Sequence, residues 1–321
     1  MIVDAHNDVL LELVLDPEDE RRLELVLRRG DERPFERYWL PELEASGVGV
    51  QICPLYGATA PREEARAWAL AQEAEFTSAV EQNAERVCRV RVRDELDDSR
   101  LGLVLSMEGG EPLEGDAAAF DQWYELGVRT ASLTWNYEND FAGGIDTPTQ
   151  GLTERGRALV RRFGELRVVL DLAHASEQTW RDVMEEDLPF SVTHAACRAI
   201  HDHRRNLADW QLEEIAARGG VLGVMALAFA VDPKTPTLER WVDHVDHAVG
   251  VMGIEHVGLG ADFVFDPVAA RKARFGLRGF TGPDDYPALV EALRSRGYDG
   301  EDLEAILSRN WLRVLRASLP A

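Results

Sequence analysis

Histidine and carboxylate side chains stand at the ends of the short apolar runs of this sequence. Six residues share this position: His6, Asp8, Glu108, His174, His194 and Asp262. Imidazole nitrogens and carboxylate oxygens together are the ligands of zinc and similar divalent cations. Five or six such groups exceed what one ion needs, so the sequence predicts a site for two metal ions.

His6 and Asp8 are separated by one residue, directly after the first apolar run. Side chains two positions apart on an extended backbone point to the same side, so both can reach one ion. An H-x-D pattern elsewhere in a sequence is more often a turn aspartate beside an incidental histidine. The position after the first run favours metal ligation.

Glu108 belongs to the segment S-M-E-G-G-E, after the third apolar run. Gly109 and Gly110 allow a sharp turn and a close approach of the backbone, which would direct the carboxylate towards a shared site. The residue types are consistent with a carboxylate that bridges two ions, or with an ordinary loop glutamate that accepts a backbone hydrogen bond.

His174 in D-L-A-H-A-S and His194 in S-V-T-H-A-A both end apolar runs, and one helix-length segment separates them. They are therefore expected on neighbouring strands. One histidine at a strand end is usually structural, whereas two on successive strands favour ligation. Asp262 in G-L-G-A-D-F either caps a short helix or moves protons beside the metals.

Arg205 in R-R-N is a candidate for binding a substrate carboxylate, because a guanidinium presents paired donors that match it. The alternative is an ordinary surface arginine, followed by Asn206 as the N-cap of the next helix. The residues alone leave both readings open.

The remaining histidines are not expected to bind metal. His244 and His247 are expected on the solvent face of a charged helix. His201 and His203 lie in the loop after His194, where nothing in the sequence assigns them a role.

The elements that must position these residues alternate regularly. Eight apolar runs predict strands: Ile2–Ala5, Gly47–Pro54, Leu101–Met107, Arg129–Thr134, Arg167–Leu172, Phe190–Thr193, Gly220–Met225 and His256–Gly260. The segments between them include five with helical spacing: Arg62–Val87, Thr153–Glu165, Glu177–Glu186, Leu207–Arg218 and Leu238–Val251. Eight strand–helix repeats predict an α/β fold of the (β/α)₈ TIM-type barrel class, in which chemistry occurs at the carboxyl ends of the strands.

The 321 residues, 45% of them hydrophobic, are enough for one such barrel. We expect a single domain over residues 1–321, with loop elaborations near 16–36 and 266–287. A net charge of −23 argues against nucleic acid and anionic membrane surfaces as partners. Three cysteines are too few for a disulfide framework, and no apolar run is long enough to span a membrane. These features predict a cytoplasmic protein.

The same residues, in the same order, resemble the renal or membrane dipeptidase family, a group of binuclear zinc peptidases with an amidohydrolase-like barrel. The resemblance covers nearly the whole chain and is carried by these segments: D-A-H-N-D, E-G-G, L-T-W-N-Y-E-N-D, G-L-T-E-R-G-R, D-L-A-H-A-S, V-T-H-A-A, R-R-N-L-A-D, G-L-G-A-D-F and Y-P-A-L-V-E-A-L.

The resemblance implies a hydrolase that cleaves dipeptides through a hydroxide bridging two zinc ions. Carried over position by position, it assigns one ion to His6 and Asp8 and the other to His174 and His194. Glu108 would lie between the ions as a catalytic and metal-binding carboxylate. It further implies that Arg205 holds the terminal carboxylate of the substrate, that Asp262 transfers protons, and that a homodimer is allowed.

Two positions depart from the family pattern. Trp135, followed by Asn136, stands where many members have a substrate-contacting histidine, so these two residues are expected to contact substrate, with Asn136 as a substitute hydrogen-bond donor. The family's D-F-D-G is replaced by Asp262, Phe263, Val264 and Phe265. Two alternative functions remain: a related binuclear hydrolase acting on another amide, a lactone or a phosphoester, and a non-catalytic metal-stabilised binding protein.

Overall fold

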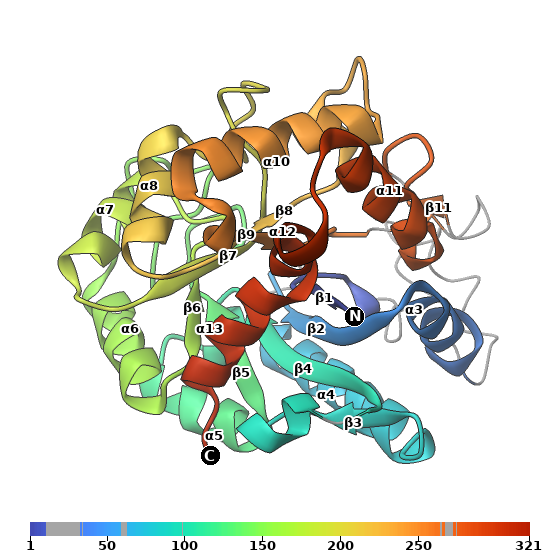
Figure 1. The fold of residues 1–321 in the computed structure, drawn as a ribbon. Coiled ribbons are helices and arrows are strands. Elements are labelled where there is room, and N and C mark those ends of the chain that lie inside the picture. Colours follow the sequence, from blue (N-terminus) through green and yellow to red (C-terminus); the bar gives the residue numbers. More distant parts are fainter. Residues whose placement is uncertain are drawn as a thin grey trace.

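A computed structural model describes residues 1–10, 33, 35–58, 63–97, 99–263, 265–266, 272–273 and 275–321. Within these residues, eight parallel strands form a closed barrel, surrounded by helices (Figure 1). The barrel strands are β1 (Ile2–Asp4), β2 (Val48–Tyr56), β4 (Leu101–Glu108), β5 (Val128–Ser132), β6 (Val169–Asp171), β7 (Phe190–Ala195), β8 (Leu222–Val224) and β9 (Val257–Leu259). The (β/α)₈ prediction is confirmed.

The barrel closes through parallel pairing of β1 with both β2 and β9, and of β2 with β4. The register of β2 with β4 runs from Val50 opposite Gly102 to Tyr56 opposite Glu108. Parallel pairing throughout places all carboxyl ends of the strands at one mouth, as a barrel requires.

The surrounding helices lie between and after the strands. They are α3 (Leu40–Ser46), α4 (Ala65–Gln82), α5 (Phe120–Glu125), α6 (Glu154–Leu166), α7 (Glu177–Glu185), α8 (Asp209–Ala217), α9 (Ala228–Val231), α10 (Leu238–Met252), α11 (Tyr286–Arg296), α12 (Gly300–Glu304) and α13 (Asn310–Ser318). Three of them begin at a hydroxyl side chain that accepts a backbone N–H: Thr153 before α6, Ser176 before α7 and Thr237 before α10. In the described part of the chain, no helix is both long and apolar enough to cross a membrane.

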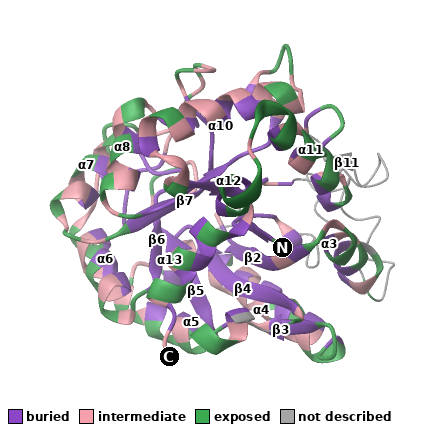
Figure 2. Cartoon of the chain, viewed as in Figure 1, coloured by how far each residue is buried: buried purple, intermediate pink, exposed green. Residues whose placement is uncertain are grey.

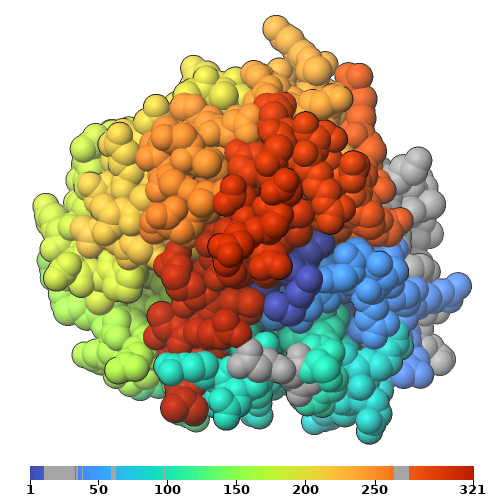
Figure 3. Space-filling view, in the orientation of Figure 1, coloured from blue at the N-terminus to red at the C-terminus, as the bar shows by residue number. Residues whose placement is uncertain are grey.

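The strands are buried and the helices expose their outer faces, so the core lies in the barrel and in the layer between strands and helices (Figure 2). α13 crosses the amino-terminal end of the barrel, and the C-terminal helices cover the middle of this face (Figure 3). Trp311 of α13 is buried against Gly258 of β9, where a Cβ atom would lie 2.5 Å from the indole nitrogen. The amino-terminal end is therefore closed by packing.

Three short strands were not expected. β3 (Val87–Arg89) pairs with the start of β4, although the sequence pattern predicts that a helix continues to Val87. The helix ends at Gln82 because Asn83 leaves the helical conformation, and a three-residue strand is too short to show a period. β10 (Phe265–Asp266) and β11 (Lys272–Ala273) form an antiparallel pair.

Two of the other expectations concern loops and cysteines. Most of the elaboration expected near 16–36, and residues 267–271 and 274 of the one expected near 266–287, lie outside the described residues. Cys53, Cys88 and Cys197 are buried and none of them is in a disulfide.

Candidate metal centre

The carboxyl ends of β1, β4, β6, β7 and β9 bring the six predicted side chains together. Glu108, the last residue of β4, lies at the centre of this group. Its Oε1 is 3.1 Å from His174 Nε2 and 3.6 Å from His194 Nε2, and its Oε2 is 3.7 Å from His6 Nε2. One carboxylate therefore faces three imidazoles from three different strands.

The two remaining carboxylates also lie close to His6. Its Nε2 is 3.9 Å from Asp8 Oδ1 and 3.8 Å from Asp262 Oδ1, while His174 and His194 bring their Nε2 atoms within 2.8 Å of each other.

Three overlapping groups could each hold a cation, since the ligand atoms within each group lie within 4.8 Å of one another. The groups are His6, Asp8 and Glu108; Glu108, His174 and His194; and His6, His194 and Asp262. The first two share Glu108. The third group combines His6 with His194 across the predicted division of ligands, so that division stays a prediction.

The buried carboxylate of Asp4 fixes the end of β1 against β9. Its Oδ1 accepts the backbone N–H groups of His6 (2.9 Å) and Ala261 (3.2 Å), and its Oδ2 accepts Asn7 Nδ2 (3.1 Å). The backbone N–H of Asp262 donates to the carbonyl of His6 at 2.9 Å. These bonds hold Asp262 beside His6.

Asp171 joins β6 to β7 in the same manner. Its Oδ1 accepts the backbone N–H groups of Ala173 (2.9 Å) and Thr193 (3.0 Å), and its Oδ2 accepts the Thr193 hydroxyl at 2.5 Å. The two segments so joined carry His174 and His194. A buried aspartate below the mouth thus sets the spacing of each pair of ligand-bearing strands.

Hydrogen bonds also orient the two imidazoles of β6 and β7. His174 Nδ1 donates to Asn136 Oδ1 at 2.7 Å, and His194 Nδ1 donates to the Thr193 hydroxyl oxygen at 2.9 Å, since that hydroxyl gives its own proton to Asp171. Both Nε2 atoms are then left with a lone pair towards Glu108. Partners of this kind fix the tautomer of metal-binding histidines.

Two of the site residues have a left-handed backbone conformation. The φ angles are +63° at His174 and +61° at Asp262, which is uncommon for residues other than glycine. Such strain costs about 1–3 kcal/mol and persists where surrounding contacts enforce it. Gly109, with φ +86°, makes the sharp turn expected after Glu108, and its N–H donates to Ser132 Oγ.

Burial controls the charges of the centre. Desolvation lowers the pKa of His6 to about 3 and holds the pKa values of His174 and His194 well below the usual range, so the three imidazoles are neutral. Desolvation raises the pKa of Asp262 to about 6 and that of Glu108 well above its ordinary value, where Asp8 and Asp262 add repulsion. The cluster therefore combines neutral imidazoles with closely spaced carboxylates.

Arg205 is the buried cation of this region. It is 6% exposed, its Nη2 lies 3.0 Å from His174 Nε2, and the same atom donates to the carbonyl of His194 at 3.4 Å. Burial lowers its pKa, and the charges of Asp262 and Glu108 oppose that shift. The sequence prediction placed Arg205 beside the metals, and the structure agrees on the location.

A cavity of about 470 Å³ opens over the centre. Its walls include Trp135 and Asn136, as expected for residues that contact substrate. The Trp135 ring centroid is 5.7 Å from that of His174, and the ring meets Tyr56 edge to face at 5.6 Å. The side-chain oxygen of Asn136 serves His174, a role that the sequence did not indicate, and its amide nitrogen has no partner among the described residues.

Several residues of the cavity were not anticipated. They are Tyr56, His203, Arg204, Leu227, Phe229 and Phe275. Arg204 forms an ion pair with Asp146, whose backbone N–H donates to the carbonyl of Asn136. Tyr56 ends β2, so its position at a strand end could have identified it, but a search restricted to histidines and carboxylates passes over a phenol.

Two structural interpretations of the sequence were wrong. Asn206 does not cap the following helix, since α8 begins at Asp209 and the Asn206 amide donates to the carbonyls of His201 and Ala230. His244 was expected on the solvent face of its helix but is fully buried. There it accepts the backbone N–H of Cys197 and donates to the carbonyl of Val231.

The sequence is similar to those of known dipeptidases. Residues 1–319 match the family model described as membrane dipeptidase, peptidase family M19. The chain is 33% identical over 240 residues to an uncharacterised protein in the pqqA 5′ region of Klebsiella pneumoniae, covering 68% of this chain and 83% of that protein. It is 30% identical to dipeptidase 3 of Mus musculus over 231 residues, which are 68% of this chain but only 44% of the mouse protein.

Two solved structures extend the likeness to the fold. One, described as a dipeptidase and metallo peptidase of family M19, has a TM-score of 0.85 and 26% identity, with 100% of this chain and 99% of that chain covered. The other is a metallo peptidase from Rhodobacter sphaeroides with a phosphinate mimic of the dipeptide L-Ala-D-Ala, with a TM-score of 0.84, 25% identity and 99% of both chains covered.

Proposed function

Because the chain belongs to the membrane dipeptidase family, peptidase family M19, we propose that it hydrolyses the amide bond of dipeptides with two bound zinc ions. One observation carries the proposal: five metal-ligand side chains and Asp262 lie together at the barrel mouth, beneath a cavity whose lining includes a buried arginine. The Rhodobacter sphaeroides structure with a dipeptide mimic supports dipeptides as the substrate class.

The donor set fits divalent cations. Neutral imidazoles and carboxylates are the ligand types that zinc prefers, and the buried carboxylates outnumber the nearby Arg205, so bound cations would offset their repulsion. His6 and Asp8 would hold one ion, His174 and His194 the other, and Glu108 both. When bound, such ions polarise a carbonyl oxygen and lower the pKa of water to about 7.

Asp262 is suited to move the proton. Its pKa, raised by burial to about 6, lies close to neutrality, where a carboxylate can both accept and release a proton. It would take a proton from the attacking water at a carboxylate oxygen and deliver it to the nitrogen of the leaving amine. Its hydrogen-bonded backbone beside His6 keeps that carboxylate at the cavity wall.

Arg205 would bind the terminal carboxylate of the substrate. A buried guanidinium pairs strongly with a carboxylate because little water competes. Because Arg205 contacts His174 and His194, a carboxylate bound to it would lie close to the metal ligands, so only a short substrate would fit between that carboxylate and the amide that is cleaved. This arrangement favours dipeptides over longer peptides, and the rings of Trp135 and Tyr56 would exclude water from the same cavity.

Metal analysis combined with a substrate panel tests the proposal. The purified chain is assayed on L-Ala-L-Ala, L-Ala-D-Ala, a lactone and a phosphoester, before chelation, after chelation and after zinc is restored. We expect about two zinc ions per chain and dipeptide hydrolysis that follows metal content. Preferential turnover of the lactone or the phosphoester, or a zinc-loaded chain inert on every dipeptide, would contradict the proposal.

The arginine assignment has its own test. In Arg205→Ala, KM for the free dipeptide should rise about tenfold or more, while KM for the C-terminally amidated dipeptide stays nearly constant. Arg161→Ala, on the exposed face of α6, is the matched control and should change neither value. Equal effects on both substrates would remove Arg205 from carboxylate binding.

A further inference from the structure

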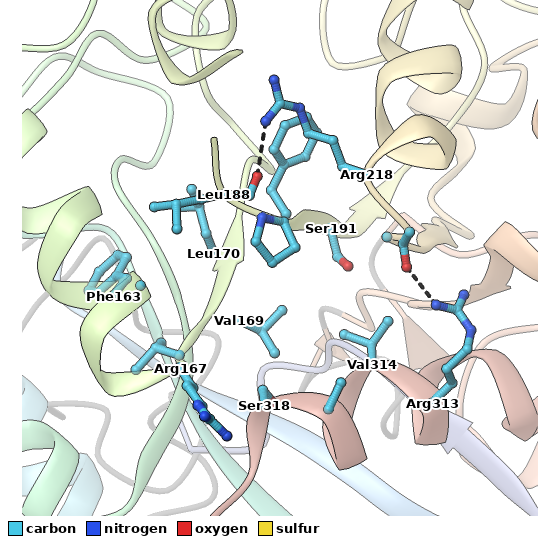
Figure 4. A pocket seen from close by; sticks show the side chains of 17 residues that line it. Phe163, Arg167, Val169, Leu170, Leu188, Ser191, Arg218, Arg313, Val314 and Ser318 are labelled. Carbon is cyan, nitrogen blue, oxygen red and sulfur yellow. Dashed lines mark hydrogen bonds between the residues drawn. The ribbon is translucent and has the colours of Figure 1, made fainter. Parts of the chain in front are cut away.

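A second cavity, of about 390 Å³, lies at the opposite end of β6 and β7 (Figure 4). It is enclosed by the last turns of α6, the amino-terminal ends of the two strands, the turn after α8 and the outer face of α13. This volume is within the range of small-molecule sites in proteins. We call it the basal cavity.

The walls of the basal cavity are apolar. Side chains of Phe163, Val169, Leu170, Phe190 and Val314 surround it, together with Leu188 and Pro189. A cavity with such walls binds the hydrocarbon part of a ligand by removing it from water.

The charged residues of the basal cavity are all basic. Arg167, Arg218 and Arg313 line it, and no aspartate or glutamate is among its described lining residues. The whole chain has 58 acidic residues against 35 lysines and arginines. A wall with three arginines and no carboxylate therefore differs in sign from the rest of the protein and favours an anion.

Two of these arginines have no carboxylate partner in the described structure. Arg313 donates to the backbone carbonyls of Gly219 (2.6 Å) and Glu255 (2.7 Å) and forms no ion pair with a described carboxylate, although the charge of Glu255 partly opposes the lowering of its pKa by burial. Arg167 is exposed at the end of α6 and makes no side-chain hydrogen bond to the described residues. Arg218 is different, since Glu214 Oε2 lies 3.7 Å from its Nε.

Ser191 adds a buried polar group. It is 1% exposed, its Oγ accepts the backbone N–H of Val221 at 3.1 Å, and its hydroxyl proton has no acceptor among the described residues. In Figure 4 the Ser191 oxygen points into the basal cavity. A buried donor without an acceptor is costly, so a ligand oxygen at this position would satisfy it.

We propose that the basal cavity binds a small amphipathic carboxylate. The hydrocarbon part packs on Val169, Phe190 and Val314, and the carboxylate accepts the Ser191 hydroxyl proton within the field of Arg167 and Arg313. The site is separate from the metal centre and does not depend on the proposed peptidase activity.

Calorimetric titration of the zinc-loaded full chain tests this proposal with octanoate as the probe and octylammonium as the probe of opposite charge. We expect octanoate to bind at least about tenfold more tightly, because charged hydrogen bonds contribute at about this level. Arg167→Ala and Ser191→Ala should each weaken octanoate binding about fivefold to tenfold. The control is Arg161→Ala. Arg161 lies in α6, near Arg167 but outside the cavity, so its substitution should leave octanoate binding unchanged.

A blocking variant locates the bound octanoate. Ala317 is exposed on α13 and lines the cavity, so Ala317→Trp should fill the space and abolish binding while the melting temperature and the zinc content stay unchanged. Octanoate binding that persists in Ala317→Trp would place the ligand elsewhere, including at the zinc ions. Equal affinity for octanoate and octylammonium, or no binding at millimolar concentration, would also overturn the proposal.

Discussion

The two ends of β6 and β7 differ in the side chains that surround them. At the carboxyl ends, Asp171, Thr193 and His194 are buried polar groups joined by hydrogen bonds. At the amino-terminal ends, Val169 and Phe190 line an apolar cavity below α13. One end concentrates negative charge and imidazole, and the other combines hydrocarbon with arginine.

The features that lower the stability of the folded barrel are concentrated at one of these two ends. The mouth holds closely spaced carboxylates with raised pKa values and two strained backbone positions, all of which oppose folding. The base is closed by Trp311 and the packed α13, which stabilise the fold. We therefore expect substitutions at the mouth to change metal binding and turnover, and substitutions of the fully buried side chains at the base, such as Trp311, to change stability.

The largest effect is expected from removing a ligand at the mouth. His174→Asn removes the imidazole, yet asparagine tolerates the left-handed conformation at this position. Zinc content should fall below two per chain, and dipeptide turnover should fall by about 10³-fold or more. Elemental analysis and steady-state kinetics measure both. A variant with full zinc content and activity would show that His174 is not a metal ligand.

Asp262→Asn separates proton transfer from metal binding. Asparagine also tolerates φ +61°, so the fold should be kept. Turnover should fall about 10²–10⁴-fold because the carboxylate no longer accepts a proton, while zinc content stays near the original value. Unchanged kcat in the zinc-loaded variant would remove Asp262 from proton transfer.

Trp311→Ala examines the opposite end. Loss of this buried ring should cost about 3–5 kcal/mol of unfolding free energy. Urea unfolding monitors the loss, and Trp311→Phe should cost less. The protein that remains folded should keep its zinc content and kcat. A loss of zinc at unchanged stability would show that the base is coupled to the mouth and would contradict the division proposed here.

Substitutions of Asn136 test whether this residue supports zinc binding through His174. Asn136→Ala removes the acceptor of His174 Nδ1 and should weaken zinc binding about 10–100-fold, whereas Asn136→Asp, which keeps an acceptor, should restore it. Competition with a chromophoric chelator measures the affinity. Tyr137→Ala, an exposed neighbour, is the control. Equal affinities in all three variants would leave Asn136 with substrate contact alone.

The smallest effect concerns His244, in the layer that supports the loop after β7. Burial lowers its pKa from 6.5 to about 4, with Arg240 and His201 acting in the same direction. The unfolded chain takes up a proton below pH 6.5 and the folded chain does not until about pH 4, so this histidine removes stability as pH falls through that window.

The expected loss is about 2 kcal/mol between pH 7 and pH 5. The stability of His244→Gln should therefore depend less steeply on pH than that of the original chain in urea unfolding at both values. If the unfolding free energies of the two proteins changed equally with pH, His244 would not titrate as its burial predicts.

The strand ends could be predicted because parallel strands align. The eight apolar runs marked the barrel, and the residues after them marked the mouth, so His6, Asp8, Glu108, His174, His194 and Asp262 could be brought together without a structure. Their individual roles are a different matter, since the ligand division and the role of Arg205 came from the family resemblance and stay predictions.

Other features could not be predicted because they depend on contacts distant in sequence. His244 looks solvent-facing by helical spacing, but it is buried by Cys197 and Val231. The bond from His174 to Asn136 joins two loops that no periodicity relates. The basal cavity arises where α13 meets β6 and β7, and helix packing of this kind leaves no local pattern.

Anomalous X-ray diffraction at the zinc edge, on crystals grown with zinc, would locate the metal ions directly. We expect two anomalous peaks at the barrel mouth, one beside His6 and Asp8 and the other beside His174 and His194, with Glu108 next to both. An absence of anomalous density among these side chains, or peaks only elsewhere on the protein, would contradict this expectation.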